Sequence, residues 1–358
     1  MGGSLVKHLF VVAALAALCL SACSRDGQVV DRSDTDHKLY VYNWSYYTPE
    51  DVVAAFEKEY GCTVILDYFA SNEEMYAKMK AAGTGAGYDI VVPSGDYVSI
   101  MKEQGMLEKI DHSLFPNERY ITPLARNAAK NYDPDLDYGV PYYLGAAGIA
   151  VHKSMISDYE PDWSIFSDER LKRRMCMMDD MREVLGDALK YLGYSVNTKE
   201  AEELKEAEEL VNTKWKPNLT KFDAEGYAKS FQQGEFAVVQ GYAEGIFEEI
   251  EEKDQDEVDF FIPSEGGPMY MDSLCIPKGS KHYKLAMQFI NYITRPENYA
   301  QFLDRFHFPS SVNTDADKYR TTKPYYEVDD LKNCELKEDL GETLYDYSEA
   351  WERIRYTE

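Results

Sequence analysis

The side chains best suited to chemistry are acids and aromatic rings that recur where predicted strands end. Asp272 lies among apolar residues of a predicted strand, two positions after Tyr270. A buried carboxylate without a partner is costly, so Asp272 is expected to meet a cation. Aromatic faces attract ammonium groups by roughly 0.5 to 2 kcal/mol. Together these residue types favour binding of a small organic cation.

A second acidic pair lies at the predicted start of a helix, where Asp180 and Glu183 are three positions apart. This spacing lets both carboxylates face one point beside the positive end of the helix. Asp180 could instead be only a helix cap, with Glu183 a first-turn acid. Both interpretations stay open from spacing alone.

Motifs of common enzymes are missing from the sequence, which has no GxSxG, Walker A or HExxH pattern and no GxGxxG after a strand. The glycine-rich segment 83–87 precedes a strand and is expected to be a turn. The cysteines that follow Cys23 are widely spaced and lack the pattern of a metal site. We therefore expect neither catalysis nor a cofactor or bound metal.

Short apolar runs alternate with amphipathic segments from Lys38 onward, which indicates an α/β fold. The first helix is expected to be capped by Thr48 and closed by Gly61, and the next to carry a capping box that begins at Ser71. Predicted strands precede and follow these helices, at 39–42, 63–69 and 88–92. Because ligands bind beyond the carboxyl ends of parallel strands, residues 43–47 and 94–97 are well placed to line a site.

The chain is long enough for two domains, and the extended segment 140–151, with its two glycines, is the expected first crossing between them. The second unit is predicted to contain strands at 175–178 and 236–240 and helices from about 181 and over 199–211. Segment 260–276 would carry the chain back, the helix 282–293 would pack on the first domain, and 331–355 would be helical. The expected division is a first lobe of 38–143 and 264–306, and a second lobe of 144–263 and 307–358.

The N-terminal residues are typical of an exported lipoprotein. Lys7 precedes an apolar run too short to span a bilayer comfortably, and 20–23 reads Leu-Ser-Ala-Cys, which matches a bacterial lipobox. Residues 1–22 are thus a predicted signal peptide, Cys23 the predicted lipidated residue, and 23–37 a polar tether. The net charge of −26 repels phosphate backbones, so nucleic acid is not an expected partner.

Four stretches together resemble bacterial spermidine/putrescine-binding proteins, and the similarity runs from about Leu39 to the C-terminus. They are LYVYNW at 39–44, SNEEMYAK at 71–78, VVPS at 91–94 and MDSL at 271–274. The resemblance implies a two-lobed type II periplasmic-binding-protein fold that closes over putrescine or spermidine. It also implies a monomer on the periplasmic side of the membrane that delivers its ligand to an ABC permease.

By motif position, the resemblance assigns the family's binding residues to this sequence. The aromatic clamp falls on Trp44, Tyr47, Tyr242 and Tyr270, the acids on Asp180, Glu183 and Asp272, and the smaller polar contacts on Ser45 and Ser94. The matching arginine in Asp179-Asp180-Met181-Arg182-Glu183 supports binding over capping for the acidic pair.

Departures from the family pattern bear on the ligand. Tyrosines replace two family tryptophans at Tyr242 and Tyr270, Asp96 replaces a tyrosine, and Phe308 replaces a tyrosine-like aromatic without its hydroxyl. Asp96 could enter the pocket or cap a helix. A lysine at 337 in place of a glutamine would oppose a long triamine and favour a shorter diamine.

Two other functions are weighed against polyamine binding. A receptor of the same fold could bind ferric ion through tyrosine pairs such as Tyr142-Tyr143, or bind a sugar. A secreted hydrolase could use Asp272 with Asp180 or Glu183 as its two carboxylates. Ferric ion needs phenolates clustered at one point, whereas a polyamine needs acids spread along a line.

Overall fold

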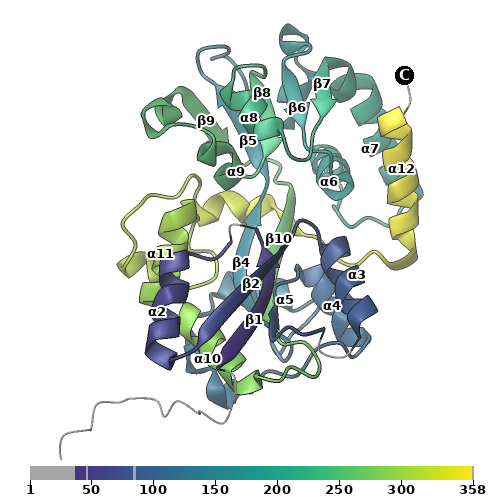
Figure 1. Cartoon of the computed structure of the whole chain (residues 1–358). Helices are drawn as coiled ribbons and strands as arrows, with labels where there is room; N and C mark the ends of the chain where they lie inside the picture. The colour runs from purple at the N-terminus through teal and green to yellow at the C-terminus, as the bar shows by residue number, and fades with distance from the viewer. Residues whose placement is uncertain (1–36, 46, 84–85, 357–358) are drawn as a thin grey trace, which may run out of the picture. The chain divides into compact units, whose positions relative to one another are not determined.

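The computed structural model describes residues 37–45, 47–83 and 86–356, drawn in colour in Figure 1. The predicted signal peptide, Cys23 and nearly all of the tether lie outside the described residues. Lys38–Glu358 forms one unit. Within the described ranges, every helix is too short or too polar to cross a membrane.

The first sheet has the order β11-β10-β3-β1-β2, with β4 also paired to β10. Its strands are β1 (Lys38–Trp44), β2 (Thr63–Phe69), β3 (Ile90–Val91), β4 (Gly139–Ala146), β10 (Pro268–Cys275) and β11 (Glu335–Leu336). β1, β2 and β3 run parallel, while β4 and β10 are antiparallel to each other. The helices of this region are α2 (Glu50–Tyr60), α3 (Asn72–Ala82), α4 (Gly95–Glu103), α5 (Pro123–Ala129), α10 (Tyr283–Ile293) and α11 (Pro296–Phe306).

Local signals fix the ends of the first helices. Gly61 closes α2 in the left-handed conformation, where glycine has no steric penalty, and the Ser71 hydroxyl accepts a hydrogen bond from the backbone N–H of Glu74. The expected cap at Thr48 is wrong. Its hydroxyl accepts a hydrogen bond from Asn43 instead, and α2 begins at Glu50 without a side-chain cap.

The chain passes from β4 to β5 (Gly148–His152) through Ala147, as the extended glycine-containing segment predicted. Both glycines are required by close packing. A Cβ on Gly145 would lie 2.8 Å from the Tyr143 ring, and one on Gly148 would lie 2.6 Å from the Phe261 carbonyl oxygen. Larger side chains at these positions would therefore displace the strands at the crossing.

The second sheet has the order β7-β6-β8-β5-β9. Its other strands are β6 (Met175–Met177), β7 (Leu219–Phe222), β8 (Val238–Gly241) and β9 (Val258–Phe261). The associated helices are α6 (Met181–Tyr191), α7 (Ala201–Leu210), α8 (Tyr227–Gln232), α9 (Ala243–Glu248) and α12 (Leu344–Tyr356). Figure 1 shows the helices α6, α7 and α12 grouped beside this sheet.

The C-terminal stretch is only partly helical, so the predicted helix over 331–355 is wrong in its first half. Leu336 belongs to β11, which pairs with β10, and Leu340 precedes α12. The apolar residues of α12 itself, among them Tyr347 and Trp351, join the buried core of the second sheet. Between β11 and α12, Lys337 contacts Glu183 of α6.

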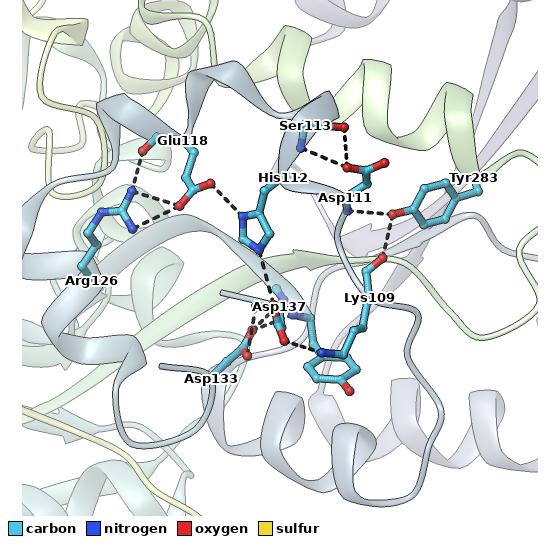
Figure 2. Close-up of polar contacts among 11 residues, drawn as sticks. Lys109, Asp111, His112, Ser113, Glu118, Arg126, Asp133, Asp137 and Tyr283 are labelled. Carbon is cyan, nitrogen blue, oxygen red and sulfur yellow. Dashed lines mark hydrogen bonds and ion pairs between the residues drawn. The ribbon is translucent and has the colours of Figure 1, made fainter. Parts of the chain in front are cut away.

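A polar network fixes the connection between α4 and β4 (Figure 2). The His112 ring bonds Glu118 through Nδ1 at 2.7 Å and approaches Asp137 through Nε2 at 3.4 Å. Arg126 pairs with the same Glu118, and the Tyr283 hydroxyl donates to the Lys109 carbonyl. The Glu118 hydrogen bond raises the pKa of His112 despite partial burial. These contacts stabilise the loop and involve none of the predicted site residues.

Candidate functional site

Asp272 is the best-defined residue of the candidate site. It lies in β10 and is 3% exposed, and its Oδ1 accepts a 2.6 Å hydrogen bond from the Ser94 hydroxyl. Ser94 is itself held by Asn72, which bonds both its hydroxyl and its backbone N–H. Within the described ranges, no lysine, arginine or histidine forms an ion pair with Asp272. The predicted burial of Asp272 is therefore confirmed, and its expected cationic partner stays a prediction.

The electrostatics of Asp272 show what the carboxylate lacks. Burial raises its pKa to about 7, while the hydroxyls of Ser94 and Tyr47 and the charge of Lys337 oppose the rise. Asp96 adds to the rise because like charges disfavour each other. A cation placed here would restore the ionised form and gain a charge-assisted hydrogen bond.

Trp44 ends β1 beside the same segment. Its indole N–H donates to the Val92 carbonyl at 2.9 Å, two residues before Ser94, and its ring packs against Phe69. The side chain remains half-buried, whereas the next residue, Ser45, is exposed. The bond to Val92 fixes the indole next to the segment that carries Ser94.

Tyr47 and Phe308 lie deeper than the resemblance implies. The Tyr47 ring packs among other aromatic residues, including Tyr142 and Phe302, and is 7% exposed. Phe308 is 1% exposed and stacks on Tyr143 with ring centroids 3.8 Å apart. Phe308 therefore packs against Tyr143, and its assignment to the ligand-binding site stays a prediction.

Asp180 caps α6, and its Oδ1 accepts hydrogen bonds from the backbone N–H groups of Arg182 and Glu183. The capping interpretation is thus confirmed for one carboxylate oxygen. The residue is still half-buried, which leaves the other oxygen at the edge of the site. Its charge acts on the neighbouring acid, because Asp180 is one cause of the raised pKa of Glu183.

Glu183 has no exposed surface, and its charge is met by the chain itself. Lys337 Nζ lies 2.6 Å from Glu183 Oε1, and the two side chains are 16% and 0% exposed. Burial raises the pKa of Glu183, and Lys337 opposes that rise. Burial opposes the charge of Lys337 too, but Glu183, Asp180 and Asp96 together raise its pKa. An internal ammonium group therefore occupies the position expected for one end of a ligand.

Asp96 faces the same group of charges from the other side. It is half-buried in the first turn of α4, and its carboxylate accepts a hydrogen bond from the backbone N–H of Tyr97. Burial raises the pKa of Asp96, while Lys337 and Arg182 oppose the rise. Asp96 therefore adds negative charge to the site. It is not the N-cap of α4, because Ser94 occupies that position.

The two substituted tyrosines come together. The rings of Tyr242 and Tyr270 meet edge to face with centroids 5.5 Å apart. The Tyr242 hydroxyl donates to Glu183 at 3.2 Å, which provides the partner that a tyrosine needs in place of tryptophan. Both tyrosines are half-buried, so each keeps some ring surface free.

Two further acids near the site were not predicted. Asp187, one helical turn after Glu183, is fully buried and accepts a hydrogen bond from the Gln240 amide. Burial raises its pKa well above the ordinary value, because the charged form is poorly solvated in the core. Glu244 follows Tyr242 at the start of α9 and is half-buried. Its position just after a predicted strand and an aromatic residue could have identified it as a candidate site residue from the sequence.

The arrangement can bind a cation but offers little to a metal ion. Three acids of the site, Asp272, Asp96 and Asp180, have no ion pair with a described residue. The fourth, Glu183, pairs with Lys337. No cluster of three or more histidine, cysteine or acidic side chains in the described part of the chain is arranged to hold a metal. The four described cysteines are unpaired, at 62, 176, 275 and 334.

Comparison with known proteins places the chain in a family. Residues 51–327 match bacterial extracellular solute-binding proteins. The spermidine/putrescine-binding periplasmic protein of Escherichia coli is 32% identical over 356 residues, covering 98% of each chain.

Solved structures show the same relationship. The TpPotD lipoprotein of Treponema pallidum has 50% identity and a TM-score of 0.86, over 89% of this chain and 99% of that one. A spermidine/putrescine transporter substrate-binding protein of Streptococcus pneumoniae has 27% identity and a TM-score of 0.79, over 89% and 98%. The fold is thus the two-lobed α/β fold of periplasmic binding proteins, and the chain belongs to the spermidine/putrescine-binding branch of the bacterial extracellular solute-binding proteins.

Proposed function

We propose that this protein is an extracytoplasmic receptor that binds a small polyamine and presents it to an ABC importer. The observation that carries the proposal is Asp272, a buried carboxylate without an ion pair to any described residue, two positions from the half-buried Tyr270 in β10. The half-buried Trp44 bonds Val92, two residues before the Ser94 that bonds Asp272. A primary ammonium supplies both the positive charge and the N–H donors that this carboxylate lacks. The apolar carbons of the ligand would lie along the rings, at about 0.8 kcal/mol for each buried methylene group.

Putrescine fits these residues better than spermidine. One ammonium would bind Asp272, and the second would be shared by Asp96 and the free oxygen of Asp180. Lys337 already pairs with Glu183, so a third ligand ammonium would meet an ammonium of the chain. Repulsion between two like charges with little solvent between them costs far more than in water.

Ferric ion is a poorer candidate ligand. The hydroxyls of Tyr143 and Tyr326 bond each other at 2.8 Å, and Tyr142 donates to the Tyr47 carbonyl. Burial raises the pKa of all three of these hydroxyls, which opposes the phenolate form that iron requires. A two-carboxylate hydrolase is disfavoured as well, because Glu183 is buried against Lys337.

Delivery of ligand follows from the fold. We propose a division with 38–143 and 264–306 in one lobe and 144–263 and 307–358 in the other. The second sheet supports it, since all of its strands lie within 144–263, whereas β11 and the end of β4 join the first sheet and shift the boundary there. We propose that the lobes close over the ligand, that the closed monomer is recognised by the permease, and that Cys23 carries a lipid on the periplasmic side of the membrane. A Cys23→Ser chain is expected to leave the membrane fraction of expressing cells.

Calorimetric titration against a panel tests the function. The purified chain should bind putrescine in a 1:1 complex with a submicromolar Kd, which corresponds to more than about 8 kcal/mol of binding free energy. Spermidine should bind equally or more weakly, and glucose and ferric citrate should give no heat of binding. Native mass spectrometry of protein purified without added ligand would identify a retained amine by its mass. Binding of ferric ion or a sugar without any amine would reject the proposal.

A further inference from the structure

Glu244 lies where the chain enters α9, close to the crossing between the sheets. The last residue of β8, Gly241, pairs with Gly148 of β5, and Glu244 follows three positions later. One turn further along the same face of α9, the Phe247 ring stacks on Tyr325 with centroids 3.9 Å apart. The face of α9 that carries Glu244 therefore packs against aromatic residues, and Tyr242, just before α9, contacts the Tyr270 ring.

Tyrosine hydroxyls and one carboxylate surround Glu244. Its charge contributes to the raised pKa of tyrosines from several elements, at 143, 227, 242, 270, 325 and 326. Burial raises the pKa of Glu244 to about 7, and the Asp272 carboxylate adds to the rise. The charged groups that face Asp272 in turn are Lys337 and Asp96. Among the described residues, no lysine, arginine or histidine is a cause of the pKa shift of Glu244.

Glu244 differs from the other acids of its helix. Glu248 pairs with Arg305 at 3.1 Å, and Glu249 is exposed to solvent. Glu244 is half-buried, its carboxylate forms no ion pair with a described residue, and it accepts a hydrogen bond from its own backbone N–H. The Tyr270 hydroxyl likewise forms no hydrogen bond with another described residue. Two polar groups of this kind beside Asp272 are costly unless a ligand satisfies them.

We infer that Glu244 is a second carboxylate for the ammonium end that Asp272 receives, so this end of the ligand is held from both lobes. The inference rests on the proposed polyamine-binding function and deepens it. One oxygen of Asp272 accepts the Ser94 hydrogen bond, whereas a primary ammonium has three N–H donors that need acceptors. Glu244 and the Tyr270 hydroxyl supply the remaining acceptors. The site thereby selects a primary ammonium over a tertiary or quaternary one.

Binding is also coupled to protons. Asp272 is buried and Glu244 half-buried, and with pKa values of about 7 both carboxyl groups are partly protonated at neutral pH without ligand. An incoming ammonium favours the ionised form of each, so the complex forms with release of protons to the solvent. Affinity for a diamine consequently rises as the pH is raised from about 6 to about 8, until both carboxyl groups are already ionised.

Calorimetry of putrescine binding to Glu244→Gln tests this inference, with Glu249→Gln, at the residue that follows α9, as the matched control. Titrations at pH 6 and pH 8, each in phosphate and in Tris, separate the affinity from the number of protons released. At pH 8 the Glu244→Gln chain should bind about tenfold or more weakly than wild type. The loss should shrink at pH 6, and proton release should fall. Glu249→Gln should match wild type in both quantities.

Glu244→Asp guards against a folding artefact, since it keeps the charge and should retain most of the proton release. Equal affinity and equal proton release in wild type and Glu244→Gln would overturn the inference while leaving the receptor function intact. Failure of the unmodified chain to bind either putrescine or spermidine would reject the proposed function and the inference with it.

Discussion

Replacing Lys337 by glutamine should change which polyamine the protein prefers. Lys337 Nζ lies 2.6 Å from Glu183 Oε1 in a pair with almost no solvent access. Asp180 and Asp96 also raise the pKa of Lys337, which favours its charged form. Removing the ammonium frees the Glu183 carboxylate for a cation supplied by the ligand. Spermidine carries one more ammonium than putrescine and can use that freed acid.

The magnitude follows from the interaction that is exchanged. A hydrogen bond to a charged group contributes about 1.5 to 3 kcal/mol. The ratio of spermidine to putrescine affinity should therefore rise roughly 10- to 150-fold in Lys337→Gln. Breaking a buried pair can cost about 3 to 5 kcal/mol of stability. Here the cost should be smaller, because burial raises the pKa of Glu183 and lets it take up a proton.

Calorimetric titration with each amine, together with urea unfolding, measures both effects. Lys332→Gln is the control, because Lys332 is an exposed lysine on the same C-terminal segment. The control should leave the affinity ratio and the stability unchanged. An unchanged ratio in Lys337→Gln, with both amines still bound, would refute the view that Lys337 occupies an ammonium position of the site.

Three further predictions concern stability. His112 gains a carboxylate partner on folding, which raises its pKa, so its contribution is present below about pH 6.5 and is lost as the pH rises through the folded-state value. Because the ring is partly exposed, urea unfolding of wild type and His112→Asn should differ by only about 0.5 kcal/mol, at pH 5.5 and not at pH 8.5. Burial raises the pKa of Asp187, so its contribution to stability is lost as the pH rises above the pKa of the unfolded chain. The stability of Asp187→Asn relative to wild type should therefore increase between pH 4.5 and pH 8 in urea unfolding. A constant difference between the two chains over this range would contradict the prediction. Phe308→Ala should leave a cavity beneath Tyr143 and cost about 3 to 5 kcal/mol in thermal or urea unfolding; a loss below about 1 kcal/mol would show that the ring is not packed as described.

Local sequence signals predicted much of the fold. The Ser71 cap, the Gly61 termination and the extended crossing with its glycines depend on residues close together in the chain, and the structure confirms each. The predicted C-terminal helix failed where long-range pairing decides. Leu336 fits an amphipathic pattern, yet it pairs with Met269 in a sheet. Periodicity alone cannot weigh that competing partner.

The candidate site divides in the same way. Asp272 could be predicted because an acid within an apolar strand is unusual in any context. The pairing of Glu183 with Lys337 joins residues 154 positions apart, and only the fold brings them together. The burial of Phe308 was not predicted, because motif position does not report burial. Glu244 was overlooked because it is one of several acids on a short helix, and its half-buried setting depends on tyrosines from other elements.

Titration of putrescine into wild type and Asp272→Asn at pH 8 tests the central claim most directly. The substitution keeps the shape of the side chain and the contact with Ser94 but removes the charge. Truncating one member of a buried charged contact costs about 2 to 5 kcal/mol, so the variant should bind at least about tenfold more weakly while unfolding at a similar urea concentration. Equal affinity in the two chains would show that Asp272 does not receive the ammonium group of the ligand.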